Sequence, residues 1–421
     1  GLPEISTSRW SYFKGGLQSY YKYFNFFIDN FNKTFGIIFD VNLQSLDILM
    51  PLGISFFTFH SISYLVDIYR NQSQPMINPL DVGLYISLFP QLVAGPIIRY
   101  HDVAKQIDER KNSLETFSSG VERFVFGLGK KVLLANAFGN VADLVFNSDA
   151  HSLTLASSWL GMVCYSLQIY FDFSGYSDMA IGLGRMFGFE LLENFNYPYI
   201  ATSIRDFWRR WHLSLSAWFR DYLYIPLGGS KKSLIRTEMN LFIVFLLCGL
   251  WHGASWNFVL WGCLHGFFLV LERGKFGSFL KIMPHFVGRI YAILVVMFAW
   301  VLFRSDSAAY AFKYIQTLLS FSNPGILSPE LQLQLTAQFY VKLAVGFIAS
   351  TPVLTFMSSD WRSRKYPISS PAYLTDLPAK FSNFTCLSLL ACRATCVASV
   401  VCLSISELAT TTFNPFIYFR F

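Results

Sequence analysis

The sequence is poor in charged residues and lacks the motifs of several soluble enzyme classes. Only 14% of its 421 residues are charged, whereas 53% are hydrophobic and 18% are aromatic. Soluble domains usually carry about 25% charged residues, so water is not the solvent on all sides of this chain. There is no Gly-x-Ser-x-Gly elbow, no Walker loop and no His-Glu-x-x-His pair, so three common catalytic signatures are missing.

Cysteines and basic residues do not form the patterns that would indicate a disulfide framework, a metal site or a nucleic-acid site. The seven cysteines are odd in number and include no Cys-x-x-Cys pair, so neither a disulfide framework nor a metal site is indicated. The formal net charge is +7, but no long basic run accompanies it, which argues against nucleic acid. In a membrane protein such an excess is typical of cytoplasmic loops and of contact with anionic headgroups.

The sequence does contain a series of apolar runs of roughly 17 to 25 residues, the length that crosses a bilayer. They cover residues 50–69, 82–98, 155–171, 240–257, 258–271, 286–303, 337–357 and 384–406, with a weaker aromatic candidate at 17–39. We therefore predict an all-α polytopic membrane protein. No linker or internal repeat divides it, so we expect a single transmembrane domain over residues 1–421.

Two amphipathic stretches lie between the apolar runs, at 117–146 and 203–224. They resemble helices that lie in the plane of the membrane interface. Basic clusters at 205–236 and 362–365 are separated by four predicted spans. An even number places both clusters on one side, which the positive-inside rule makes cytoplasmic.

His252 is the sharpest candidate for chemistry. It follows the apolar run 241–248 and lies between Trp251 and Gly253, well within membrane depth. Ionisable residues in such segments are costly and are read as functional by default. A neutral imidazole there can take a proton from a hydroxyl, a role worth about 10²–10⁴ in rate. The residues alone leave open a structural histidine satisfied by a neighbouring helix.

Other polar residues lie on the stretch that precedes the His252 span. His212 is positioned to orient a substrate, although a basic aromatic surface helix explains a histidine without catalysis. Asp206 and Arg209 belong to a charge network in the same stretch. That network faces headgroups, a cofactor or simply solvent.

Two carboxylates and a glycine run complete the candidates. Asp172 and Asp178 lie in an apolar context and must pair or protonate there, so a structural pairing with an arginine and a catalytic role both remain open. His265 is interpreted as structural. The run GLGRMFG at 182–188 follows a membrane segment and no strand of a βαβ unit, so we expect it to serve close helix packing.

Several motifs follow one another from about Pro51 to the C-terminus. They are DFSGYSDMA (172–180), NFNYPY (194–199), DFWRRWHLSLS (206–216), DYLYIPLGG (221–229), GLWHGASWNF (249–258) and NPFIYFRF (414–421). Their order and spacing closely resemble those of membrane-bound O-acyltransferases, in the branch containing the bacterial alginate O-acetyltransferase membrane subunit.

This resemblance implies a fold and a site. The expected fold is a ring of many tilted helices, with amphipathic interfacial helices, around a central funnel. The resemblance implies that His252 is the catalytic histidine and that His212 is a second active-site residue. The residues that we expect to bind substrate are Trp251, Asp206, Arg209, Asp178 and Asn257.

The resemblance also implies substrates, partners and location. The donor is acetyl-CoA or an acyl carrier thioester on the cytoplasmic side, with no tightly bound cofactor. The acceptor is an exported polysaccharide such as alginate, reached through an extracytoplasmic acetyltransferase partner protein. Membrane lipids surround the chain, which we place in the bacterial cytoplasmic (inner) membrane. Relatives usually carry further hydrophobic spans before a segment like 20–27, so we expect N-terminal spans to be absent here.

The residues are also compatible with other functions. D-alanyl transfer to teichoic acid uses a related membrane subunit, but the match through DYLYIPLGG favours the acetyl branch. Lipid acylation is a third reading within the class. A transporter or channel would use His252 with Asp172 and Asp178 as an ion path, although no internal repeat supports it. The residues do not decide between direct and relayed transfer.

Overall fold

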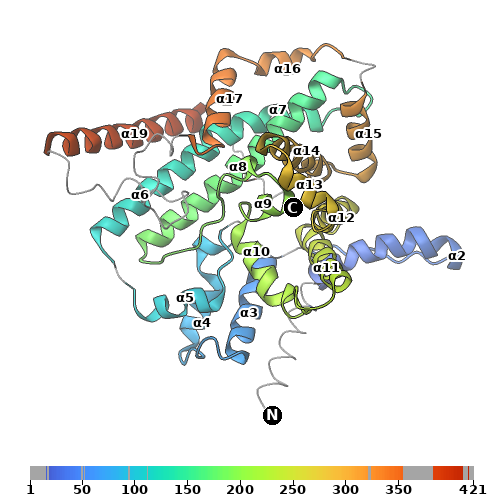
Figure 1. The fold of residues 1–421 in the computed structure, drawn as a ribbon, viewed down its shortest axis with the longest axis horizontal. Coiled ribbons are helices and arrows are strands. Elements are labelled where there is room, and N and C mark those ends of the chain that lie inside the picture. The colour runs from blue at the N-terminus through green and yellow to red at the C-terminus, as the bar shows by residue number, and fades with distance from the viewer. Residues whose placement is uncertain are drawn as a thin grey trace.

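The computed structural model describes residues 16, 19–48, 51, 53–92, 95–110, 112–320, 324–353, 383–410 and 416. Within them the chain is built from helices (Figure 1). The α-helices are α2 (Ile37–Phe39), α3 (Ile54–Tyr69), α4 (Pro79–Ser87), α5 (Tyr100–Asp108), α6 (Leu114–Gly129), α7 (Asn136–Phe146), α8 (Leu155–Met186), α9 (Ile204–Trp208), α10 (Leu213–Phe219), α11 (Leu234–His252), α12 (Trp256–Leu271), α13 (Lys275–Ile282), α14 (His285–Arg304), α15 (Ala308–Leu319), α16 (Pro329–Gln334), α17 (Ala337–Ala349) and α19 (Asn383–Thr410). Shorter π-helical or 3-10 turns are η1 (Asn32–Gly36), η2 (Phe89–Gln91), η3 (Lys130–Ala135), η4 (Pro198–Ile200) and η5 (Arg220–Tyr224).

The predicted all-α class is confirmed. Among the described residues, the isolated β-pairing is one antiparallel bridge between Phe195 and Trp211. Long α8 runs through the centre, where α6, η3 and α7 pack along it. Its start is defined by a capping box, in which Thr154 and Ser157 each bond the other's backbone N–H.

Glycines let α6 and α8 approach closely. A Cβ on Gly120 would lie 2.6 Å from the carbonyl oxygen of Gly182, and one on Gly127 would lie equally close to that of Gly175. Contacts this short exclude any larger residue, as is common where membrane helices pack through small residues. The prediction that the glycine run at 182–188 serves helix packing is confirmed.

The stretch 117–146 differs from the interfacial helix that its amphipathic pattern suggests. Its cations Arg123 and Lys131 are buried. They point to carboxylates of α8, where Arg123 pairs with Asp178 and Lys131 pairs with Asp172. The polar face of this stretch therefore reflects ion pairs inside the protein, because charges removed from water need partners.

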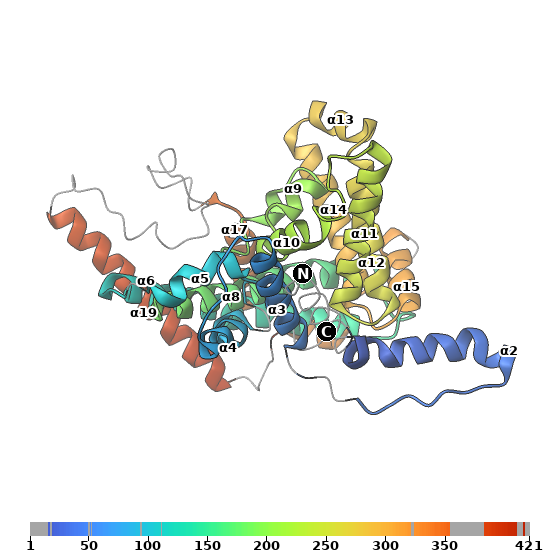
Figure 2. The same ribbon diagram turned by 90° about the horizontal axis from the view of Figure 1, so that it is seen from below.

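Helices α11 and α12 form a tight antiparallel hairpin beside α14 (Figures 1 and 2). A Cβ on Gly249 would lie 2.2 Å from the carbonyl oxygen of Phe258, and one on Gly262 would lie 2.4 Å from that of Phe245. The turn between the two helices covers residues 253–255. The hairpin therefore holds the end of α11, where His252 lies, against the start of α12.

Three helices among the described residues are long and apolar enough to cross a membrane, namely α11, α14 and residues 391–410 of α19. α12 and α17 are apolar but shorter. The predicted span at 82–98 is wrong as a single helix. α4 ends at Ser87, and Pro90 lies in the 3-10 turn that follows it, since proline removes a backbone donor.

The N-terminal helix at 19–31 and α19 extend from opposite sides of the central helices (Figure 2). α19 packs on α6 and η3. The basic cluster at 362–365 lies outside the described residues, as does most of the motif at 414–421. From that motif, the ring of Phe416 packs against Tyr176 and beneath the ammonium group of Lys131.

Candidate active site

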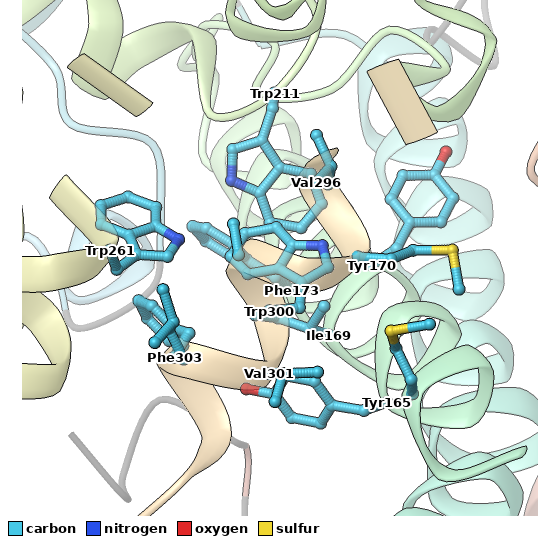
Figure 3. Packing of buried hydrophobic residues seen from close by; sticks show 14 of the residues in the cluster. Tyr165, Ile169, Tyr170, Phe173, Trp211, Trp261, Val296, Trp300, Val301 and Phe303 are labelled. Carbon is cyan, nitrogen blue, oxygen red and sulfur yellow. The ribbon is translucent and has the colours of Figure 1, made fainter. Parts of the chain in front are cut away.

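His252 is the last residue of α11 and is surrounded by aromatic rings. Its ring centroid lies 5.0 Å from that of Trp251, 5.0 Å from that of Trp261 and 5.1 Å from that of Phe303. Trp261 and Phe303 belong to the cluster of buried rings at the centre of the protein (Figure 3). Such a cage restricts the rotation of the imidazole and limits the water around it.

The N-terminal helix binds the backbone at the end of α11. The ammonium group of Lys22 donates hydrogen bonds to the carbonyl oxygens of Trp251 and His252, the latter at 3.2 Å. The hydroxyl of Tyr23 donates to the carbonyl of Leu250 at 2.7 Å. The last carbonyls of a helix have no partner within it. Lys22 and Tyr23, which the sequence analysis did not single out, therefore fix the turn that carries His252.

His212 lies on a strained turn close to the same centre. Its backbone is left-handed, with φ 45° and ψ 56°, and its side chain is buried. Asn194 holds the turn, because its carbonyl oxygen accepts from Leu213 N at 3.0 Å and its Oδ1 accepts from Ser214 Oγ at 2.6 Å. Burial lowers the pKa of His212 to about 3, so the ring is neutral.

The two predicted histidines lie in the same region of the fold. His252 lies within electrostatic range of His212, His265 and Lys22. The edge of His212 meets Phe173 with ring centroids 4.7 Å apart, and its Nε2 has no hydrogen-bond partner among the residues that the structure describes. The fold thus brings together two histidines that are forty positions apart in the sequence.

Two further ring nitrogens, on Trp261 and His265, lie near this centre and have no partner in the described part of the chain. Nε1 of Trp261 is buried and unpaired. His265 accepts a hydrogen bond at Nδ1 from Nε1 of Trp208, at 3.3 Å, which assigns its proton to the buried and unpaired Nε2. Both groups are donors that can bind a carbonyl oxygen. No sequence motif indicates a functional role for Trp261, and the helical position of His265 predicts only a structural role.

A cavity of about 280 Å³ approaches the helix of His252 from the basic stretch. We call it the arginine-lined cavity, because the guanidinium groups that line it are Arg205, Arg209, Arg220 and Arg273. Its other walls are mostly apolar and include Trp208, Phe245 and Cys248. Cys248 lies one turn before His252 on α11. The cavity thus combines four cations with an apolar wall that includes the part of α11 just before His252.

The remaining predicted residues occupy three different positions. Asp206 lies in the first turn of α9, pairs with Arg210 at 2.9 Å and accepts from Thr202 N. The amide of Asn257 donates to the carbonyl of Ser305, so it joins α12 to the end of α14. Asp178 pairs with Arg123 and Lys130 in a separate region. Its geometry favours the structural pairing over a catalytic role.

Comparison with known proteins identifies relatives of this chain. The family model described as membrane-bound O-acyltransferase matches residues 69–310. The probable alginate O-acetylase AlgI of Azotobacter vinelandii is 38% identical over 96% of this chain and 82% of its own length. The peptidoglycan O-acetyltransferase of Helicobacter pylori is 38% identical over 74% of this chain and 64% of its own length. The teichoic acid D-alanyltransferase of Bacillus subtilis is 33% identical over 51% of this chain and 56% of its own length.

Proposed function

Because the chain belongs to the membrane-bound O-acyltransferase family, we propose that it is a multi-pass O-acetyltransferase that modifies an exported polysaccharide such as alginate. We place the protein in the bacterial cytoplasmic membrane. The names of the relatives support both the acetyl group and the polysaccharide. The single observation that carries the chemistry is the position of His252, in an aromatic cage next to donors that lack partners.

The arginine-lined cavity is the proposed site of the donor. Acetyl-CoA and the phosphopantetheine of a carrier protein both carry phosphate, which guanidinium groups bind well. Both also carry a thioester on a long, largely uncharged arm. Arg209 at the cavity and Cys248 beneath His252 mark the two ends of such a path. The positive-inside rule places this basic stretch on the cytoplasmic side.

His252 acts as the general base in this proposal. The acceptor oxygen attacks the thioester carbonyl carbon while the imidazole takes the hydroxyl proton. The N–H groups of Trp261 and His265 stabilise the negative charge on the carbonyl oxygen. The carbon–sulfur bond then breaks, and the imidazolium returns the proton to the thiolate. The products are an ester and a free thiol.

The acceptor hydroxyl comes from the extracytoplasmic side. It is supplied by the polysaccharide or by an extracytoplasmic acetyltransferase partner protein that completes the transfer. His212 stays neutral next to His252 and orients the acceptor. A neutral second histidine adds no positive charge that would repel the imidazolium formed during the reaction.

The test follows labelled acetyl from acetyl-CoA into polysaccharide or partner protein, in membranes that contain wild type or His252→Ala. We expect the variant to lose about 10²-fold or more of the transfer. The matched control is His285→Ala, since His285 is exposed at the start of α14. Full activity of a folded His252→Ala protein would make His252 structural. Labelled D-alanine in place of acetyl distinguishes the teichoic acid reaction.

A further inference from the structure

A second and larger cavity lies apart from the proposed transfer site. Its volume is about 1050 Å³, and it lies between α6, η3 and α8 on one side and α17 and α19 on the other. None of the residues that line it also lines the arginine-lined cavity. We call it the lateral cavity. The proposed transfer of acetyl groups makes no use of it.

One wall of the lateral cavity is a polar face of α8. Tyr170, Ser174, Ser177 and Asp178 follow one another at helical spacing and all line it. Ser174 and Ser177 are each 2% exposed, and their buried hydroxyls have no hydrogen-bond partner among the described residues. A buried polar group without a partner is destabilising, because it has given up its hydrogen bonds to water. A polar group inside the cavity would give these hydroxyls a hydrogen-bond partner.

The segment after α8 adds another unpaired donor. The side chain of Asn194 lines the cavity and is 1% exposed, and its Nδ2 has no partner in the part of the chain that the structure describes. Its Oδ1 accepts from Ser214 Oγ, two residues after His212. A ligand bound to Nδ2 would therefore brace the turn of His212.

The opposite wall carries the ion pair of Lys342 and Glu407, but it also has an apolar part that opens to the exterior of the protein. This apolar part is formed by Val341 and Val345 of α17 and by Val400 and Leu403 of α19. Val345 is 47% exposed and Leu403 is 58% exposed. In a bilayer these side chains meet acyl chains, because α19 is a candidate span with 6% of its apolar window buried. The lateral cavity thus connects a polar interior to surrounding lipid.

The charges around the cavity are balanced. Its cations are Arg123, Lys130 and Lys342, and its anions are Asp178, Glu193 and Glu407. Lys130 bonds Asp178 at 2.5 Å, and Lys342 bonds Glu407 at 3.0 Å. A lining of equal positive and negative charge suits a headgroup that carries both signs. It does not favour an anionic headgroup.

We propose that the lateral cavity binds one zwitterionic phospholipid of the phosphatidylethanolamine type. Its headgroup occupies the interior and hydrogen-bonds Ser174, Ser177 and Asn194. One acyl chain lies against Val345 and Leu403 and leaves the protein between α17 and α19. The lipid is a resident ligand that supports the His212 turn, and its binding does not depend on the acetyl donor.

The test measures lipid retained by the full chain. Protein is purified from nanodiscs that contain equal amounts of phosphatidylethanolamine and phosphatidylglycerol, and bound lipid is counted by native mass spectrometry. We expect about one phosphatidylethanolamine per wild-type chain. The Val345→Trp, Leu403→Trp double variant, which fills the cavity from its exposed side, should retain at least tenfold less.

The matched control is Phe347→Trp with Ile405→Trp, on the same two helices. Phe347 is 51% exposed and Ile405 is 60% exposed, and neither lines the cavity. This control should retain lipid as wild type does. Equal retention by all three proteins would overturn the proposal, and so would a preference for phosphatidylglycerol. Because the measurement needs no acetyl transfer, it stands even if the proposed enzyme function fails.

Discussion

Lys22 and His252 are joined by a hydrogen bond from the ammonium group of Lys22 to the carbonyl oxygen of His252, at 3.2 Å. The same ammonium group bonds the carbonyl of Trp251 and lies 5.8 Å from the centre of the Trp251 ring. A helix at the start of the described chain thus holds the catalytic candidate more than two hundred residues later. Without Lys22, two carbonyls at membrane depth lose their donor, which lipid does not replace.

We expect Lys22→Met to lower kcat for acetyl transfer about tenfold, with KM for the donor nearly unchanged. The His252 turn would move while the arginine-lined cavity stays in place, and small displacements of a catalytic group are costly. Lys22→Arg should restore part of the rate. Lys33→Met, at an exposed position of η1, is the control for loss of one positive charge. A lower melting temperature with unchanged kcat would limit Lys22 to a structural role.

Substitutions of His212 should distinguish the role of its left-handed backbone from the role of its imidazole ring. Asparagine tolerates the left-handed backbone that His212 adopts, whereas a β-branched residue does not. We therefore expect His212→Asn to keep the melting temperature within a few degrees and to lose about 10-fold or more of transfer. His212→Val should also unfold at a lower temperature. Wild-type activity of His212→Asn would remove the ring from the mechanism.

Arg209→Gln should weaken donor binding at the arginine-lined cavity. Hydrogen bonds to charged groups contribute about 1.5–3 kcal/mol, so KM for acetyl-CoA should rise about tenfold while kcat changes little. High salt should reduce the difference between variant and wild type. Arg236 is exposed and does not line the cavity, and Arg236→Gln provides the control. Equal kinetics of the two variants would place the donor elsewhere.

His101 should give the fold a stability that depends on pH. Its Nδ1 donates to Oδ2 of the buried Asp67 at 2.9 Å, and this hydrogen bond raises the pKa of His101. The folded protein therefore keeps the proton to a higher pH than the unfolded chain, in which histidine titrates near about 6.5. The stabilisation is complete below that pH and is lost as pH rises through the folded pKa.

The check is the melting temperature across pH 5.5 to about 8.5, since unperturbed histidine titrates in the lower part of that range. Wild type should lose stability with rising pH, and His101→Gln should flatten that slope. His151→Gln changes an exposed histidine and should leave the slope as in wild type. A slope that persists unchanged in His101→Gln would contradict the assignment.

Much of the site could be anticipated from residues near one another in the sequence. The apolar run predicted a membrane span over 240–257 that carries His252, and α11 does carry it, although the helix covers 234–252 and ends at that histidine. Glycines at 182–188 predicted close packing. The prediction of one span over 82–98 is wrong, because hydrophobicity alone does not show that the helix ends before Pro90.

The helical class, the lipid surroundings and the residue types available for chemistry can be inferred from the sequence alone. These follow from composition and period, which are local properties. The three-dimensional packing was needed to show that Lys22 binds the end of α11, that Trp261 and His265 leave donors near His252, and that Asp178 pairs with Arg123. Such contacts join positions far apart in the chain, and their geometry depends on helix packing that no local pattern encodes.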